Sequence, residues 1–500
     1  MHRLYLPLFA VIFSVSTLRA EEPRAAWVAS FDGPQEHSDE ARGVALTSDG
    51  YSYVLGTAYD PRPGHGSSFV LILYRPDGTE AWRRVYEPPG KNAGAGGVGE
   101  IQVDSRDRAV AVGWGRTGAG ASLFIARIDR NGRPDFLLTP PTASPYFIYY
   151  PPQLVLGSDD GFVLSATRDG DYLVQRYDAS GELLWEWTYD GPKPDADLAT
   201  GVALGSDGSV VVTGIPGVNG SGYTTIRLDP NGSPAWERNQ FGFFGVTLGH
   251  AEVAIDSAGD VVLSGTPEST CGVHHIQTWK YSSTGEELWS HAFPSDPCLL
   301  IEVEDMALDG AGNALVLGTG YIDDFGNYDL QLLKYSSGGE LMWRRAYDGF
   351  AETSDHASAV AVDADGAAYI LGQTQSVVGQ HDLTIVKYQS DGTREWSRTY
   401  DGGSTEWPKD IAVSAAGDVI ATGHQYHALG QAADFVTVAY QQNGCAADVT
   451  GDHVVDRADA DRLQAAAGPC VDLCPEDLNG DRTVDQADGE ILRASMGPCP

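Results

Sequence analysis

The sequence predicts an all-β fold, an eight-bladed β-propeller closed by its N-terminal strand, followed by a small domain of loops and helices. Three observations predict it. An aromatic residue recurs every 49–55 residues, each period contains four strand-like segments, and an acidic stretch of twelve residues occurs twice near the C-terminus. We therefore expect three regions: a signal peptide over 1–20, a propeller over 21–444 and a small domain over 445–500.

The composition indicates a folded, acidic protein. With 42% apolar residues, the 500-residue chain has enough apolar material for a large core. Its 32 basic and 69 acidic side chains give a formal net charge of −37. Such a surface repels phosphate backbones, so we expect no nucleic-acid partner, whereas it suits divalent cations.

The first twenty residues, MHRLYLPLFAVIFSVSTLRA, are typical of a secretory signal. Arg3 precedes an apolar run over 4–15, which is too short to span a bilayer. We expect cleavage after Ala20, with cleavage after Ser16 or a retained N-terminal anchor as alternatives. No other stretch predicts a membrane span, and six cysteines suit an oxidising compartment. The sequence thus predicts a secreted or cell-surface protein.

A turn followed by an aromatic residue marks the repeat. Examples are DGTEAW (77–82), SGELLW (180–185) and DGTREW (391–396). The recurring aromatic residues are Trp27, Trp82, Phe136, Trp185, Trp236, Trp289, Trp343 and Trp396. Eight positions at such even spacing indicate one repeated structural unit.

Each period contains four segments with strand character. In one period they are 360–363, 367–372, 383–388 and the segment that carries the Trp. Runs such as VVVTG (210–214) are apolar on both strand faces, which favours sheets packed between neighbouring sheets. Four-stranded units of about 50 residues in radial repetition describe a β-propeller. Independent sandwiches are the alternative, but they would need linkers.

The repeats also predict how the ring closes. The last period ends after its third strand, within 434–444, while the segment 25–33 supplies a fourth strand at the other end of the chain. We therefore expect the N-terminal strand to complete the eighth blade and remove an open sheet edge. Seven blades and a stray strand would leave Trp27 without a role.

These turn–Trp repeats resemble the tryptophan-docking motif of quinoprotein-like eight-bladed propellers and, more loosely, secreted bacterial propeller repeats. The resemblance covers residues 25–444 and implies the fold. Quinoprotein dehydrogenases hold their cofactor partly with adjacent half-cystines, and this chain contains no Cys-Cys pair. The resemblance therefore does not extend to a quinone cofactor.

The long connections of the blades should gather on one face, where a rigid scaffold usually presents its binding loops. The candidate loops are 58–68, 114–121, 138–150, 239–250, 319–328 and 401–409. Cys271 and Cys298 fall in neighbouring loops of this face, and we expect them to form a disulfide.

Two loops have a distinctive composition. The aromatic segment 139–152, with Tyr146, Phe147, Tyr149 and Tyr150, could stack on sugar rings, anchor a protein, or fill space between blades. Asp323, Asp324 and Asp329 could hold a cation or could simply be solvated acids.

Enzyme motifs are missing from the sequence. It contains no GxSxG, HExxH, phosphate-binding loop or CxxC. We therefore expect a binding protein without catalytic or cofactor-binding residues that can be named. A polysaccharide-degrading hydrolase or lyase is one alternative, and a purely structural surface protein is another.

The repeated acidic segments are DVTGDHVVDRAD (448–459) and DLNGDRTVDQAD (477–488). Oxygen-bearing residues occupy positions 1, 3, 5, 9 and 12, and position 7 can offer a backbone carbonyl, as a calcium loop requires. The predicted ligands are Asp448, Thr450, Asp452, Val454, Asp456, Asp459, Asp477, Asn479, Asp481, Thr483, Asp485 and Asp488. The apolar Val455 and Val484 at position 8 should pair the two loops, and a short helix should follow each.

This duplication resembles a type I dockerin over residues 445–500, and the resemblance implies two Ca²⁺ sites and a cohesin-type partner. His453 and Arg482 stand at position 6, where EF-hand loops usually have Gly. Positions 10 and 11 lack the hydroxyl pair common in dockerins, so docking within the chain or onto a cell-surface protein is the alternative.

The remaining cysteines repeat with the loops. Bridges Cys445–Cys470 and Cys474–Cys499 would each fasten one loop to its helix end, while other pairings of the four are open. A zinc site is the alternative. Such a small domain needs metal or disulfides to fold.

Overall fold

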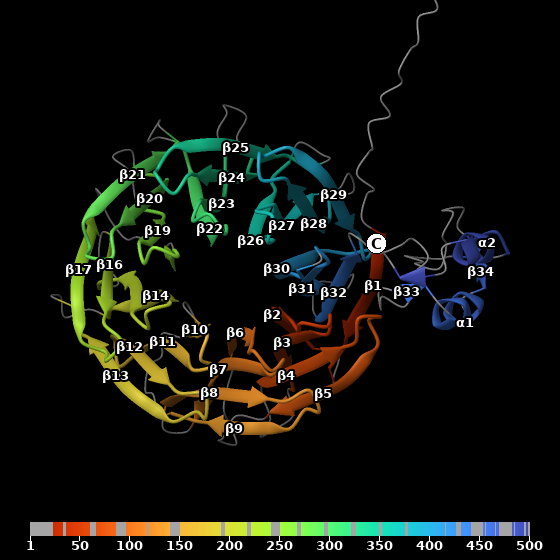
Figure 1. Cartoon of the computed structure of the whole chain (residues 1–500), viewed down its shortest axis with the longest axis horizontal. Coiled ribbons are helices and arrows are strands. Elements are labelled where there is room, and N and C mark those ends of the chain that lie inside the picture. The colour runs from red at the N-terminus through yellow and green to blue at the C-terminus, as the bar shows by residue number, and fades with distance from the viewer. Residues whose placement is uncertain are drawn as a thin grey trace, which may run out of the picture.

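In the computed structural model of the protein, eight sheets are arranged as the blades of a ring (Figure 1). The structure describes residues 24–33, 37–60, 67–86, 97–117, 120–140, 151–191, 196–217, 222–241, 251–267, 272–294, 299–321, 327–349, 353–375, 379–415, 417–426 and 432–441, and in the C-terminal region 454–455, 457–465, 467–469, 483–484, 486–494 and 497–498.

Each blade is a four-stranded antiparallel sheet, and its strands follow one another from the inside of the ring outwards. The first four blades contain β2 (Asp39–Leu46), β3 (Ser52–Tyr59), β4 (Ser67–Tyr74) and β5 (Glu80–Tyr86); β6 (Gly97–Val103), β7 (Ala109–Thr117), β8 (Gly120–Ile128) and β9 (Pro134–Leu138); β10 (Gln153–Leu156), β11 (Phe162–Arg168), β12 (Asp171–Tyr177) and β13 (Leu183–Tyr189); and β14 (Leu198–Leu204), β15 (Val210–Ile215), β16 (Gly222–Leu228) and β17 (Pro234–Phe241).

Blades five to eight repeat this order. They contain β18 (Ala251–Ile255), β19 (Val261–Gly265), β20 (Ile276–Tyr281) and β21 (Glu287–Phe293); β22 (Ile301–Leu308), β23 (Ala314–Gly320), β24 (Asp329–Tyr335) and β25 (Leu341–Tyr347); β26 (His356–Val362), β27 (Ala368–Gln375), β28 (His381–Tyr388) and β29 (Arg394–Tyr400); and β30 (Glu406–Val413), β31 (Val419–Tyr426) and β32 (Ala433–Gln441) with β1 (Arg24–Phe31).

The predicted closure of the ring is confirmed. The eighth sheet has the order β1-β32-β31-β30, so the N-terminal strand is its outermost strand. β1 is antiparallel to β32, from Arg24 opposite Gln441 to Phe31 opposite Phe435. The ring thus closes through main-chain hydrogen bonds between the two ends of the propeller (Figure 1).

The core lies between neighbouring blades. One cluster joins Leu371 and Ile385 of blade seven to Val436 and Val438 of blade eight. Strands in the middle of a blade are packed on both faces, and every residue of β15 is buried. The doubly apolar strands predicted from the sequence therefore follow from this sandwiching of each sheet.

The recurring Trp residues join each blade to the next. The indole Nε1 of six of them donates to a backbone carbonyl in the turn between the last two strands of the following blade, at 2.7–3.2 Å. These bonds are Trp27–Pro76, Trp82–Arg130, Trp185–Pro230, Trp236–Ser283, Trp289–Ser337 and Trp343–Ser390. The recurring Trp in the sequence is therefore the residue that contacts the neighbouring blade.

The turn glycine is needed at the same contact for two reasons. Gly285 has φ +83°, a conformation that a residue with a Cβ rarely adopts. A Cβ at this position would also lie 2.8 Å from Cγ of Trp236. The Gly and the Trp of the repeat therefore form one unit across two blades.

The described parts of the C-terminal region contain two short helices, α1 (Arg457–Ala465) and α2 (Gln486–Ala494), and each begins at the tenth residue of an acidic segment, close to the predicted place. Four two-residue strands accompany them: β33 (Val454–Val455), β34 (Gly468–Pro469), β35 (Thr483–Val484) and β36 (Gly497–Pro498). β33 pairs with β36 and β34 pairs with β35, so each segment pairs with the Gly-Pro of the other repeat. The expected direct pairing of position 8 in the two segments is thus wrong for the described strands.

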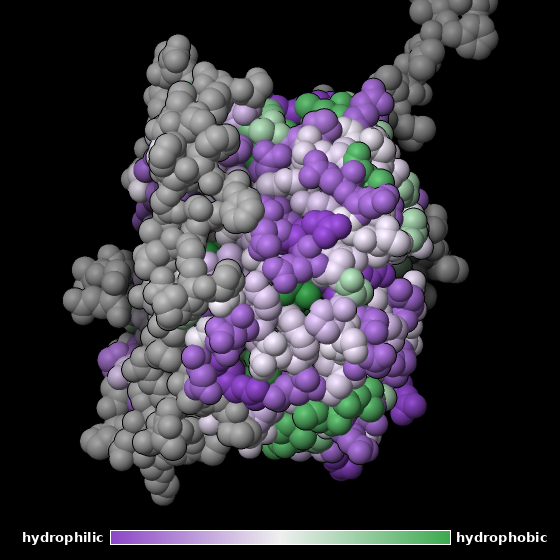
Figure 2. Space-filling model, turned by 90° about the vertical axis from the view of Figure 1, so that its left-hand side faces the viewer, coloured by the Kyte–Doolittle hydropathy of each residue, from purple (hydrophilic) through white to green (hydrophobic). Residues whose placement is uncertain are grey.

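On the side of the ring shown in Figure 2, hydrophilic areas alternate with near-neutral areas and a few hydrophobic ones. Exposed apolar side chains occur in small groups, such as Leu183 and Leu184 on β13. In the part of the chain that the structure describes, no helix is both long enough and apolar enough to cross a bilayer.

Candidate functional site

The inner strands place variable side chains along the axis of the ring. Six of them contain a break in the strand pairing near the start of the strand. In five of these one residue has no partner opposite it, and in β6 the two residues Gly99 and Glu100 have none. The bulged residues are Arg42, Thr200, Glu304, Ser358 and Lys409. A bulge re-aims a side chain that would otherwise belong to the sheet. The ring thus offers one adaptable position per bulged blade.

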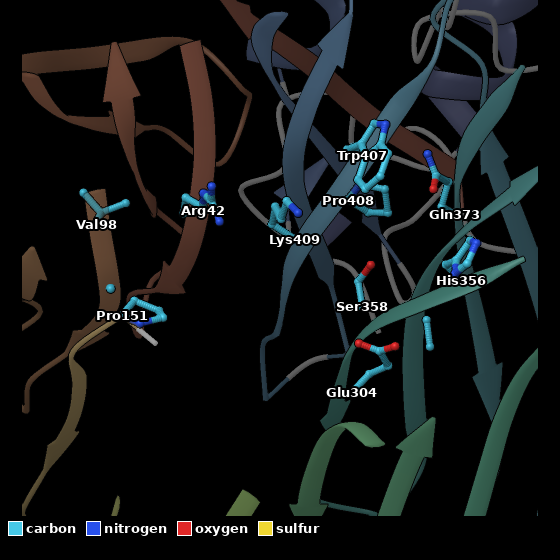
Figure 3. Close-up of a pocket in the computed structure, with 12 residues that line it drawn as sticks. Arg42, Val98, Pro151, Glu304, His356, Ser358, Gln373, Trp407, Pro408 and Lys409 are labelled. Carbon is cyan, nitrogen blue, oxygen red and sulfur yellow. The ribbon is translucent and has the colours of Figure 1, made fainter. Parts of the chain in front are cut away.

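Four of these bulged residues line a pocket of about 530 Å³ at the centre of the ring (Figure 3). Its walls come from blades one, two, six, seven and eight and from the segment before β10. The lining residues are Arg42, Val98, Gly99, Pro151, Glu304, His356, Ala357, Ser358, Gln373, Trp407, Pro408 and Lys409. Residues far apart in the sequence therefore meet in one cavity large enough for a small ligand.

Trp407 gives the pocket an aromatic wall. Its side chain is 43% exposed, one of the largest exposed apolar groups of the described residues. The indole lies parallel to the imidazole of His424 at 6.4 Å, and Lys409 Nζ lies 5.4 Å from the indole centroid. Burial lowers the pKa of His424 to about 4, so this ring supports the indole in its neutral form. The arrangement holds one indole face in place.

Charge is unevenly distributed around the pocket. Arg42 and Lys409 supply two cations, and Arg42 Nη2 forms an ion pair with Glu40 Oε2 at 2.8 Å. Burial and the nearby Arg42 lower the pKa of Lys409. Glu304 is the only carboxylic acid among the described residues that line the pocket. The site therefore combines an aromatic surface, two basic side chains, one acid and neutral polar groups.

A second set of acids lies within or one residue after a break in the pairing of an inner strand and joins neighbouring inner strands. In each case the carboxylate accepts a hydrogen bond from a backbone N–H of the next blade. The pairs are Asp410 with Val44 at 2.8 Å, Asp305 with Val360 at 2.7 Å and Glu100 with Leu154 at 3.2 Å. Burial is the main cause that raises the pKa of Glu100 to about 8 and that of Asp410 to about 7. These acids have a structural role between blades.

The predicted binding loops are only partly described. Loop 401–409 is the one described throughout, and its last four residues begin β30, where they supply Trp407 and Lys409 to the pocket. Tyr146, Phe147, Tyr149 and Tyr150 lie outside the described residues, as do Asp323 and Asp324. Asp329 lies near Asp348 and Asp355.

The predicted calcium ligands and disulfides remain predictions. Of the twelve ligand positions, Val454, Asp459, Thr483 and Asp488 fall in described strands or helices, and the other eight lie outside them. All six predicted disulfide positions, Cys271, Cys298, Cys445, Cys470, Cys474 and Cys499, also lie outside the described residues.

Most pocket residues were not identified from the sequence. Arg42, Ser358 and Lys409 occupy the same position of the repeat, each directly after an Ala or Pro of the inner strand. The signal in the sequence is therefore a polar or charged side chain at one repeat position. Its meaning depends on the bulge, which the sequence pattern does not reveal.

The chain is similar to several solved structures at low sequence identity. No protein-family model and no curated protein matches the chain. Among solved structures, the quinohemoprotein alcohol dehydrogenase from Comamonas testosteroni is similar over 86% of this chain and 78% of that chain, at 11% identity and TM-score 0.49. Quinohemoprotein alcohol dehydrogenase ADHIIG from Pseudomonas putida HK5 is similar over 87% of this chain and 78% of that chain, at 12% identity and TM-score 0.47. The β-propeller domain of the Trilobed protease from Pyrococcus furiosus is similar over 73% of this chain and 99% of that chain, at 12% identity and TM-score 0.42.

Proposed function

We propose that this is an exported binding protein whose propeller holds an acidic carbohydrate in the central pocket. The observation that carries the proposal is the exposed indole of Trp407 next to the cations Arg42 and Lys409 in one cavity. An indole face suits the apolar face of a sugar ring. The two cations suit a carboxylate on that ring, as in a uronic acid.

The remaining pocket residues support the same ligand class. Ser358, Gln373 and His356 offer polar groups for sugar hydroxyls, and Val98 and Pro151 add apolar surface. Gln373 is held in position because its Nε2 donates to the backbone oxygen of Glu406 at 2.8 Å. A cavity with an apolar surface and a few fixed polar groups is the usual form of a small-ligand site.

Calorimetry with a galacturonic acid oligosaccharide and a neutral cello-oligosaccharide of equal length tests the proposal. We expect the acidic ligand to bind and the neutral one to bind more weakly. Trp407→Ala should weaken binding about tenfold, or roughly 1.4 kcal/mol. Lys409→Met should reduce the preference for the acidic ligand, because it removes a cation beside the indole.

Tyr59→Ala is the matched control, since Tyr59 is 41% exposed but does not line the pocket. It should leave binding unchanged. Binding of neither oligosaccharide, or equal losses in the Trp407 and Tyr59 variants, would contradict the proposal.

We also propose that residues 445–500 form a calcium-ordered, dockerin-like attachment domain with two Ca²⁺ sites, fastened by disulfides. The support is the duplicated acidic segment, the helix that begins in each copy, and the reciprocal pairing of β33–β36 and β34–β35. Its partner would be a cohesin-type module or a cell-surface protein. The signal-like N-terminus supports export to the surface or the medium.

Calcium binding to the full chain tests the attachment domain. Asp448→Asn and Asp477→Asn, which change position 1 of each segment, should together remove two binding events and the calcium-dependent gain of helix. An unchanged calcium stoichiometry in this double variant would rule out the proposed sites.

A carbohydrate-degrading enzyme is less well supported. Glycoside hydrolysis ordinarily uses two carboxyl groups on either side of the scissile bond. Among the described lining residues the pocket supplies Glu304 alone. The appearance of reducing ends during the binding experiment would favour the enzyme.

A further inference from the structure

Three carboxylic acids meet at the junction of blades seven and eight. They are Asp382 at the start of β28, Asp401 after β29, and Glu406 at the start of β30. One carboxylate oxygen of each lies within 4.8 Å of those of the other two. Three segments of the repeat thus bring carboxyl groups to one point.

Three other junctions contain the same arrangement. Each combines an acid from the third strand of a blade, an Asp that follows the outer strand, and an acid at the start of the next blade. The clusters are Asp434, Asp32 and Asp39; Asp171, Asp190 and Asp197; and Asp329, Asp348 and Asp355. They allow a comparison within one molecule.

In these three clusters the acid before the inner strand is satisfied by the main chain. Asp355 accepts hydrogen bonds from the backbone N–H groups of Gly349 at 2.5 Å and Gln375 at 3.0 Å. Asp197 accepts from Gly191 at 2.5 Å and Gly217 at 2.7 Å. Asp39 likewise accepts from Gly33 and Tyr59. Their role is structural.

The junction of blades seven and eight departs from this pattern. Its acid is the longer Glu406, four residues after Gly402, whereas Asp355 follows Gly349 by six. Glu406 Oε1 accepts from Gly402 N at 3.2 Å, but the second backbone donor is lost because Tyr426 N donates to Thr405 O instead. Glu406 therefore keeps one carboxylate oxygen without a main-chain donor.

Two buried oxygens of this cluster have no hydrogen-bond partner among the described residues. They are Glu406 Oε2 and Asp382 Oδ1, on side chains that are 0% and 5% exposed. Neither acid forms an ion pair with a described Lys, Arg or His. Buried carboxyl groups are otherwise protonated, paired with a cation or bound to a metal, because an isolated buried charge is very costly.

We propose that Asp382, Asp401 and Glu406 bind a divalent cation of the calcium type at the junction of blades seven and eight. Calcium prefers oxygen ligands and accepts carboxylates in a flexible geometry. The cation would neutralise the two unpartnered oxygens and join the two blades. It would also fix the start of β30, which carries Trp407, so that calcium occupancy would stabilise the wall of the pocket.

The test uses the full chain with the substitutions Asp448→Asn and Asp477→Asn, which disable the two proposed sites of the attachment domain. We expect this background to bind one further Ca²⁺ by calorimetry. Asp382→Asn or Glu406→Gln should weaken that binding at least about tenfold, since even outer-shell changes often cost that much. Asp355→Asn, in a cluster satisfied by the main chain, should leave it unchanged.

Thermal unfolding in calcium and in EGTA provides a second readout. Calcium should raise the melting temperature of the background, and Asp382→Asn should abolish that rise while circular dichroism shows an intact fold. No calcium binding by the background, or equal weakening in the Asp382 and Asp355 variants, would overturn the proposal. If Glu406→Gln raises the melting temperature equally with and without calcium, the acids share a proton instead, and the proposal is wrong. None of these outcomes depends on carbohydrate binding.

Discussion

At the scale of single residues, the contact between a Trp and the next turn is the repeated unit of this protein. Blade two shows what happens when the indole is missing. Its residue is Phe136, and the carbonyl of Ala179 in the next turn accepts instead from Arg127, whose guanidinium lies 5.3 Å from the Phe136 ring. A donor from a neighbouring strand thus replaces the indole, and the packing is kept.

The indole hydrogen bond should have a measurable stability. Trp236→Phe keeps an aromatic ring on Gly285 but removes the bond to Ser283 O, which is 3.1 Å long. We expect a loss of about 0.5–1.5 kcal/mol in the free energy of unfolding, measured in urea. Trp187→Phe is the control, since Trp187 packs against Tyr189 and its Nε1 forms no hydrogen bond with a described residue. Equal effects of the two changes would show that ring size, and not the hydrogen bond, matters.

At the scale of elements, β1 has a special role because the first strand of the propeller completes its last blade. β1 covers β32, which would otherwise be the exposed edge of the eighth sheet. An exposed edge presents unpaired N–H and C=O groups to other chains. β1 also packs apolar side chains, including Trp27 and Phe31, into the core between blades eight and one.

Removing β1 should therefore affect both stability and association. A variant without residues 24–33 should unfold at a lower temperature and should self-associate through β32. Size-exclusion chromatography with light scattering measures the association. Trp27→Phe, which keeps the strand and loses the 2.9 Å bond to Pro76 O, should remain monomeric. A monomeric deletion variant of unchanged melting temperature would mean that β1 is dispensable.

At the scale of the whole molecule, the central acids link stability to pH. Burial is the first cause that raises the pKa of Glu100 to about 8 and the pKa values of Glu252 and Asp410 to about 7. The folded protein therefore retains protons that the unfolded chain has already lost near pH 4–5. Stability should fall as the pH rises from about 5 to 8.

Melting temperatures across this pH range check the expectation. The slope of the unfolding free energy against pH is proportional to the number of protons released on unfolding. Glu252→Gln should lower that number by up to about one, because it removes one group that titrates in this pH range only in the folded protein. Glu182→Gln, on the exposed outer strand region, should leave the slope unchanged. A flat profile for the unchanged protein would show that the central acids are ionised throughout.

Much of the architecture could be predicted because the side chains that define each repeat act within that repeat or on its immediate neighbour. The Gly–Trp pair, the doubly apolar strands such as β15, and the unmatched segment before Asp32 predict the blade, its burial and the closure. The helices α1 and α2 begin within their acidic segments for the same reason.

The sites were harder to predict because they depend on register and on distant segments. Trp407 was placed in a loop, but it lies on β30, and Lys409 reaches the pocket only because a bulge interrupts the pairing beside Pro408. The cluster of Asp382, Asp401 and Glu406 combines three segments that become neighbours only when blades seven and eight pack. Among so many acids, sequence spacing alone could not distinguish them.

The pairing of Arg24 with Gln441 has a mechanical consequence. Both ends of the propeller leave the ring at the same place on its rim. A partner that held the chain beyond residue 441 would therefore hold the ring at this one place. β1 is the outermost strand of its blade, whereas the pocket is lined mainly by inner strands, so attachment and ligand capture would use different parts of the ring.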